Sequence, residues 1–228
     1  MYRTWKYIIS LLIAAGMWQG VQAQSDVPEE PKDTVPFLTG IRLEVDLASA
    51  LSSLLTTGDS WGYEAAVQVL IKNRYAPVFE MGIGGASSTS LANIDYNGNG
   101  MFYRLGVDFN MLKSKPDAKP TRNQLLVGGR LGFTNYKYDL GRIIFSDDYW
   151  GGTGARDLND LRYTALWFEI VAGLRVEIAH NIFMGWSVRM KNLLSKSEAG
   201  ALQPFHIPGY GIKADSRWGI TYSIGYQL

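Results

Sequence analysis

The stretch Tyr103-Arg-Leu-Gly-Val-Asp-Phe-Asn-Met111 has an apolar side chain at every second position, with charged or polar residues or glycine between them. A strict period of two is typical of a β-strand whose two faces meet different surroundings. We therefore expect a strand over 103–111, with one apolar face and one polar face.

Seven further segments repeat this alternation, and we expect strands over 39–47, 63–72, 79–84, 125–134, 168–178, 184–191 and 218–228. The apolar face carries no charge in any of them, whereas the other face combines glycine with long charged side chains. Glycine is a poor choice for a water-facing strand, but it makes room inside a narrow barrel. The pattern predicts an all-β fold, an eight-stranded antiparallel up-and-down transmembrane β-barrel with its apolar face toward lipid. The alternative is a soluble barrel or sandwich, which would bury the apolar face instead.

The composition argues against several classes of function. The 228 residues carry 22 Lys+Arg against 21 Asp+Glu, and this balance argues against a dedicated nucleic-acid binder. The absence of cysteine excludes a disulfide framework, thiolate catalysis and Cys-ligated zinc, and two histidines leave little for a metal site. We expect one domain, no cofactor, no metal and no nucleic-acid partner.

The N-terminus has the features of a secretory signal peptide. A positive start is followed by an apolar core over 7–17 and by small residues at the cleavage positions, which end at Ala23. As a helix the apolar core would cover about 16 Å, too short for a membrane anchor. We expect a signal peptide over 1–23, cleaved after Ala23, then a disordered periplasmic lead-in over 24–37 and an outer-membrane barrel over 38–228.

The connections between the expected strands fall into two length classes. One side has the short gaps 73–76, 113–122 and 179–181, and the other has the long gaps 48–60, 86–100, 136–162 and 192–217. Outer-membrane barrels have short periplasmic turns and longer extracellular loops. We therefore expect the long gaps to face the cell exterior.

The sequence resembles the small eight-stranded outer-membrane barrels of the OmpA transmembrane-domain and OmpX type. The resemblance covers 38–228. Its final strand is similar to the C-terminal signal that barrel-assembly machinery recognises, although the chain ends in Leu where Phe is usual; the residues concerned are Tyr222, Ile224, Tyr226 and Leu228. Residues 204–211 also resemble a segment of uncharacterised small barrels. The resemblance implies an outer-membrane location, with membrane lipid and the assembly machinery as partners.

The polar face of the expected strands carries seven cations and seven carboxylates: Arg42, Lys72, Arg104, Arg130, Arg175, Arg189, Lys191, Glu44, Asp46, Glu64, Glu80, Asp108, Glu169 and Glu177. An eight-stranded barrel is just wide enough to be filled by side chains. Removing the partner of a buried charge costs about 3–5 kcal/mol, so these groups must pair. We expect an interlocked charge network that plugs the lumen. A gated ion or proton path through the same residues is the alternative.

These features favour a non-enzymatic structural or surface-interaction protein that acts through its extracellular loops on a surface or envelope protein partner. The alternatives are an accessory barrel of an envelope assembly or secretion complex, a lipid A-modifying barrel enzyme and a narrow channel. An acyl-transfer enzyme needs a base beside its nucleophile. The expected topology puts His180 and His206 on opposite sides of the membrane, and no spacing supports pairing His206 with Ser195 or Ser197. We therefore name no catalytic residue.

Overall fold

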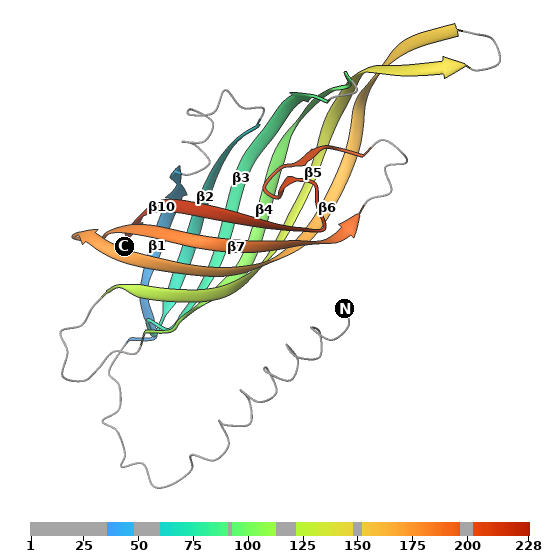
Figure 1. Cartoon of the computed structure of the whole chain (residues 1–228). Helices are drawn as coiled ribbons and strands as arrows, with labels where there is room; N and C mark the ends of the chain where they lie inside the picture. Colours follow the sequence, from blue (N-terminus) through green and yellow to red (C-terminus); the bar gives the residue numbers. More distant parts are fainter. Residues whose placement is uncertain (1–35, 48–59, 91–92, 113–121, 148–151, 197–202) are drawn as a thin grey trace, which may run out of the picture. The chain divides into compact units, whose positions relative to one another are not determined.

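The computed structural model describes residues 36–47, 60–90, 93–112, 122–147, 152–196 and 203–228. The expected signal peptide and nearly all of the expected lead-in lie outside the described residues. Within them, eight long strands form one closed barrel (Figure 1). These strands are β1 Leu38–Asp46, β2 Ser60–Ile71, β3 Tyr75–Thr89, β4 Asp95–Asn110, β5 Gln124–Asp147, β6 Gly152–Ala179, β7 Ile182–Lys196 and β10 Ser216–Gln227.

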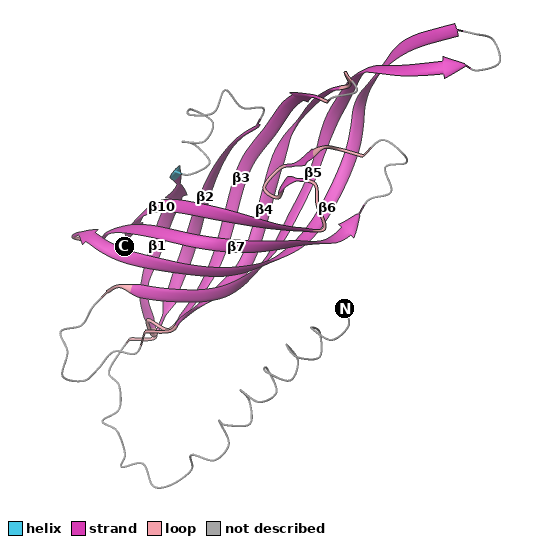
Figure 2. Cartoon of the chain, viewed as in Figure 1, coloured by secondary structure: helices cyan, strands magenta, loops and turns pink. Residues whose placement is uncertain are grey.

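Each long strand pairs antiparallel with its sequence neighbours, and β1 closes the ring by pairing with β10. This order confirms the predicted all-β, eight-stranded, up-and-down antiparallel fold (Figure 2). A separate two-stranded sheet, β8 His206–Ile207 with β9 Gly211–Ile212, lies in the connection between β7 and β10. No helix in the described ranges is long and apolar enough to cross a membrane.

The strands β5 and β6 are much longer than the sequence analysis predicted. The expected loop 136–162 is wrong for its described part, because β5 continues to Asp147 and β6 begins at Gly152. Two register shifts interrupt their pairing between Tyr138 and Ile143. The alternation continues through this region, but the apolar side chains change from the outward face to the inward face. The expectation of one constant apolar face therefore ended the predicted strands too early.

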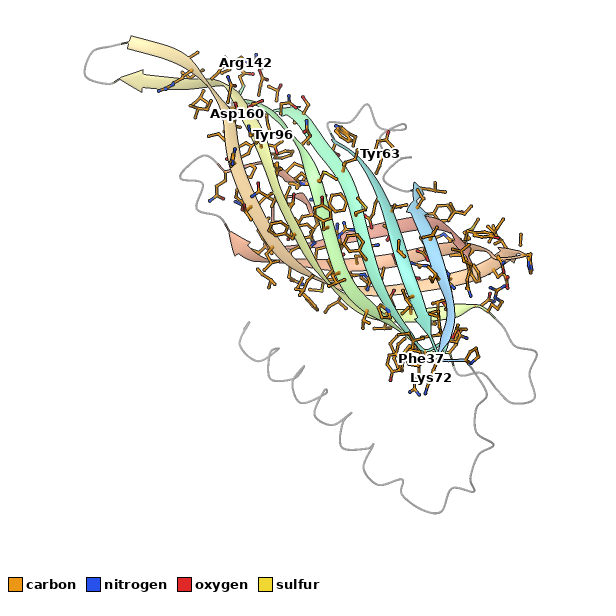
Figure 3. The ribbon with its side chains drawn as sticks, turned by 180° about the vertical axis from the view of Figure 1, so that it is seen from behind. Phe37, Tyr63, Lys72, Tyr96, Arg142 and Asp160 are labelled. Atoms are coloured by element: carbon orange, nitrogen blue, oxygen red, sulfur yellow. The ribbon has the colours of Figure 1, made fainter. Side chains whose placement is uncertain are left out.

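The turns between β2 and β3 and between β6 and β7 lie at the same end of the barrel, because consecutive strands alternate in direction. The turn between β2 and β3 begins with Lys72 and Asn73, whose φ angles of 49° and 51° are left-handed. Lys72 was expected in the lumen, but it is exposed in this turn because β2 already ends at Ile71. Figure 3 shows Lys72 at the opposite end of the barrel from Tyr96.

Side chains alternate between the two faces of the barrel wall along each strand. The outward face exposes a wide set of large apolar residues, whereas most of the predicted charged positions point inward and are buried. Examples of the outward set are Leu43, Val67, Leu105, Val127, Ile170, Leu174, Val188 and Ile224. The expected assembly-signal residues 222, 224, 226 and 228 belong to β10 and its C-terminal end, between β1 and β7.

Candidate functional site

A central cluster of charged side chains fills the middle of the barrel around Glu80. This carboxylate, only 2% exposed, contacts Arg104 at 2.9 Å, Arg130 at 3.0 Å and Arg189 at 2.7 Å. The three guanidinium groups come from β4, β5 and β7, so one carboxylate joins strands on different sides of the lumen. We call this set, with the carboxylates described next, the Glu80 cluster.

Three more carboxylates complete the Glu80 cluster. Glu64 contacts Arg104 at 2.6 Å and Arg189 at 3.3 Å. Glu169 lies 2.9 Å from Arg104 and accepts a hydrogen bond from the Trp167 indole at 2.7 Å. On the far side of the cluster, Asp108 accepts two 2.8 Å hydrogen bonds from Arg130. Charge-assisted pairs of this kind are the strong class of hydrogen bond, and here they cross-link the barrel wall through its interior.

A second group of charges lies nearer the short-turn end. Arg175 donates two hydrogen bonds to Glu44, at 2.8 and 2.9 Å. Arg42 is fully buried; it lies 3.9 Å from Glu44 and donates to Gln124 and Gln227. At the end of the barrel Glu177 pairs with Arg122 at 2.7 Å, with both side chains partly exposed. Arg122 was not among the predicted residues, because it precedes β5 and has no place in the strand alternation.

Glycines beside the arginines make this filling sterically possible. A Cβ at Gly106 would lie 2.5 Å from the Arg130 side chain, and one at Gly185 would lie 2.7 Å from the Arg175 side chain. Both distances are shorter than Cβ atoms tolerate, so each arginine lies across the space where its neighbour's side chain would be. The glycine-rich polar face thus leaves room for long side chains in a narrow lumen.

Above the Glu80 cluster, a segment of chain folds back into the barrel mouth. Residues 203–215, here called the inner segment, include β8 and β9, with Ile207 fully buried and Tyr210 only 1% exposed. Tyr96 and Tyr136 both donate hydrogen bonds to the His206 carbonyl, at 2.8 and 2.6 Å.

The tip of the inner segment rests on the charges below it. The Gly209 carbonyl accepts hydrogen bonds from Arg104 and from Lys191, both at 2.7 Å. A Cβ at Gly209 would lie 2.4 Å from the Phe102 ring, and the φ of Gly209 is +77°, so both space and backbone favour glycine here. Tyr210 packs edge-on against Trp167, which joins the segment to the aromatic upper interior.

A cavity of about 310 Å³ remains beside the inner segment. Three cations and two carboxylates line it: Arg104, Arg189, Lys191, Asp46 and Glu64. Its remaining walls come from the outer ends of β2 and β10, from Gly84 of β3 and Phe102 of β4, and from the inner segment.

The outward face changes character along β5. Phe133 is exposed and apolar, but the next outward positions are Asn135 and Lys137, both exposed. The inward face changes in the opposite sense, from Arg130 in the charge cluster to the buried Tyr136. The apolar outer surface therefore ends sharply between two adjacent outward positions of one strand.

Neighbouring strands change at the same level. The pairing register places two rows of outward residues across β4, β5 and β6, an apolar row Tyr103–Phe133–Leu166 and a polar row Asn99–Lys137–Arg162. The outward apolar residues of the barrel form a belt, and on these three strands the belt ends between the two rows. We call this boundary the belt edge.

Beyond the belt edge, β5 and β6 extend past their other partners. The pairing of β4 with β5 ends at Gly141, and that of β6 with β7 begins at Ala165. We call residues 142–147 and 152–162 the outer hairpin. Arg142 and Asp160 have left-handed φ angles of 56° and 60° at its bulges, and their backbone N–H groups donate to carboxylates at 2.9 and 2.8 Å.

Surface ion pairs brace the base of the outer hairpin. Lys137 pairs with Asp160 at 2.6 Å, and Arg142 pairs with Asp95 of β4 (Figure 3 labels Arg142 and Asp160). The hydrogen bond from Arg142 lowers the pKa of the Asp95 carboxyl below its ordinary value. These contacts hold the base of the hairpin against the rim of the barrel.

The structure places the two histidines in different parts of the barrel. His206 lies in the inner segment with its Nδ1 buried and without a hydrogen-bond partner, while His180 is exposed in the turn between β6 and β7. The side chain of Ser195 and all of Ser197 lie outside the described residues. Within those ranges, no group of three His, Asp or Glu side chains could hold a metal ion.

The chain matches the family model DUF6048, described as a domain of unknown function, over residues 4–228. No curated protein matches it.

Proposed function

Because the chain belongs to the DUF6048 family, whose description names no activity, we propose a function from the barrel itself. It is a closed outer-membrane β-barrel that anchors a docking hairpin for a protein partner at the cell surface. In this role it is neither a channel nor an enzyme. The observation that carries the proposal is the outer hairpin, which projects beyond the belt edge from a barrel whose interior is filled.

Two features support placing the barrel in a membrane. Its outward face is apolar over most of the barrel, and single-chain transmembrane barrels have such a band. The belt edge then ends that band at one level on three strands, as the boundary between hydrocarbon and water requires. A soluble barrel gains nothing from either feature.

The outer hairpin supports the docking role. Its strands have no further strand partner in the described part of the chain, so backbone N–H and C=O groups remain available along both edges. Exposed strand edges are templates for pairing with an extended segment of another protein. Ile144 is 63% exposed on this hairpin and offers an apolar contact beside charged neighbours.

Site-specific photocrosslinking in cells of the source bacterium tests the proposal. A photoreactive residue in place of Ile144 should give a discrete protein adduct, whereas one in place of Leu105, 67% exposed below the belt edge, should label lipid only. Replacing residues 144–155 with Asn-Gly joins the paired positions 143 and 156 by a two-residue turn, and this variant should no longer co-purify with the protein found in the adduct. Absence of a protein adduct at position 144 would contradict the docking role.

A further inference from the structure

On the β4 side of the outer hairpin, β5 ends as an open strand edge. β5 pairs with β4 only as far as Gly141, whereas it pairs with β6 as far as Asp147. Figure 1 shows β5 and β6 continuing beyond β4. The chain before β4 turns back instead of following β5, since the backbone N–H of Ser90 donates to the Ile94 carbonyl at 2.9 Å. Residues 142–147 therefore have no described strand on this side, which we call the β5 edge.

The β6 side of the outer hairpin differs from the β5 edge. β7 pairs with β6 only from Ala165 inward, and the chain that follows β7 includes residues 197–202, which lie outside the described part of the chain. The open edge is therefore assigned to β5 alone.

The sequence of the β5 edge lacks the residues that usually protect an exposed strand. Natural edge strands commonly carry charged side chains or proline, which discourage pairing with another chain. The stretch Ile143-Ile-Phe-Ser146 contains neither. Arg142, which precedes it, already forms an ion pair with Asp95 of β4. β-branched and aromatic residues favour the extended conformation, so this stretch is suited to pairing with a further strand.

The two isoleucines of this stretch have opposite surroundings. Ile143 is only 6% exposed and belongs to the buried aromatic cluster of the upper interior, which holds β5 in place. Ile144 is 63% exposed and lies opposite Ala155 of β6. A ribbon of two strands is only marginally stable by itself in water. A third strand beside β5 would therefore add backbone hydrogen bonds and cover part of the exposed Ile144 side chain.

We propose that the β5 edge binds an extended segment of the partner protein, which adds to the sheet as an antiparallel strand in line with β4 and places an apolar, β-branched side chain beside Ile144. The proposal rests on the docking role of the outer hairpin and specifies the contact. Antiparallel pairing continues the direction that β4 already has beside β5. In strand addition, main-chain hydrogen bonds supply affinity, and side chains at alternate positions supply specificity.

Titration of the purified full-length protein in maltoside micelles with a synthetic peptide tests this contact. The peptide alternates threonine and valine, has a lysine at each end for solubility, and is acetylated and amidated. We expect saturable binding. The same peptide with N-methyl groups on all residues between the lysines should bind about tenfold more weakly, because these residues can no longer donate backbone hydrogen bonds.

Two lysine substitutions on the same face of the outer hairpin locate the binding edge. Ile144→Lys removes the apolar contact and brings a charge to the β5 edge, so it should weaken peptide binding by about tenfold. Ala155→Lys is the matched control, because Ala155 is also exposed and lies opposite Ile144, but on β6, one strand away from the β5 edge. It should bind the peptide as the unmodified protein does.

The outcomes of the titration and of the crosslinking in cells are independent. No saturable binding, or equal affinity for the methylated and unmethylated peptides, would overturn strand addition. Equal effects of Ile144→Lys and Ala155→Lys would overturn the assignment to the β5 edge. A discrete adduct at position 144 without peptide binding would overturn strand addition and leave the docking role standing. Peptide binding without an adduct would support the open β5 edge and contradict the docking role.

Discussion

The pair of Arg175 and Glu44 shows how single residues stabilise this interior. Both side chains are buried, and two hydrogen bonds of 2.8 and 2.9 Å join them across the lumen from β6 to β1. A buried pair of this kind brings little net stability compared with an apolar one, but breaking it leaves a buried charge alone. The barrel thus depends on each partner being present.

Arg175→Ala should therefore lower the free energy of unfolding by about 3–5 kcal/mol, because Glu44 keeps only its 3.9 Å contact with Arg42 as an ion pair. Urea unfolding of the purified barrel in micelles measures this. Lys137→Ala breaks the exposed pair with Asp160 and should leave the unfolding curve unchanged within error. Equal effects of the two substitutions would contradict the buried network.

His206 predicts a pH dependence of the inner segment. Burial, followed by the nearby Arg217 and Lys191 cations, lowers its pKa from 6.5 to about 4, while Tyr96 and Tyr136 contact only its carbonyl. A folded-state pKa below the unfolded value means that stability is complete above pH 6.5 and is lost as the pH falls toward 4. Hydrogen-exchange protection of 203–215 should fall on the order of thirtyfold between pH 7.5 and 5.0.

His206→Gln provides the control for this pH effect, because glutamine does not titrate. Its protection, corrected for the intrinsic exchange rate, should stay constant over the same interval. A loss of protection as large in the glutamine variant as in the unmodified protein would assign the pH response to other groups.

At the scale of the strand, alternation was enough to predict β1 and β10 closely, since the apolar face there stays on one side, but it placed β4 over 103–111, whereas that strand begins at Asp95. It was not enough for the outer halves of β5 and β6. Tyr136 and Tyr138 continue the inward phase of Arg130, but they are apolar where the phase had been polar. If the same face is not required to stay apolar, the alternation predicts the outer halves of both strands and the position of the belt edge.

Membrane assembly should distinguish the outward face of the barrel wall from its inward face. Leu174 is 40% exposed on the outward face, and an arginine at mid-membrane costs about 2–4 kcal/mol, so Leu174→Arg should reduce the amount of assembled protein in the membrane fraction. Gly219→Ser is the inward control, because its Cβ finds space. Gly173 is unsuitable for this purpose, since a Cβ there would lie 2.9 Å from the Trp186 carbonyl. Greater loss in Gly219→Ser would mean that the faces are reversed.

At the scale of the whole molecule, the charged residues of the lumen could be predicted from strand phase, whereas their partners could not. Nothing in the sequence indicates that Glu80 meets three arginines from three strands, because barrel closure and strand stagger set those distances. The inner segment was missed for a related reason. Residues 204–211 carry no strand alternation, and only the shape of the barrel mouth shows that they fill it.

A filled interior predicts that the barrel does not conduct. The Glu80 cluster crosses the lumen, and the inner segment covers it through the contacts of Gly209 with Arg104 and Lys191. Purified protein in planar lipid bilayers should show no discrete conductance steps. Reproducible steps that Glu80→Gln alters would contradict the plug and favour an ion path through the same residues.

Heat-modifiability tests most directly whether the apolar face lies in lipid. Intact transmembrane barrels resist SDS until boiled and then change mobility on a gel. The protein should appear in the outer-membrane fraction and shift in mobility only after boiling. A protein found in the soluble periplasmic fraction, with the same mobility before and after boiling, would contradict the membrane barrel.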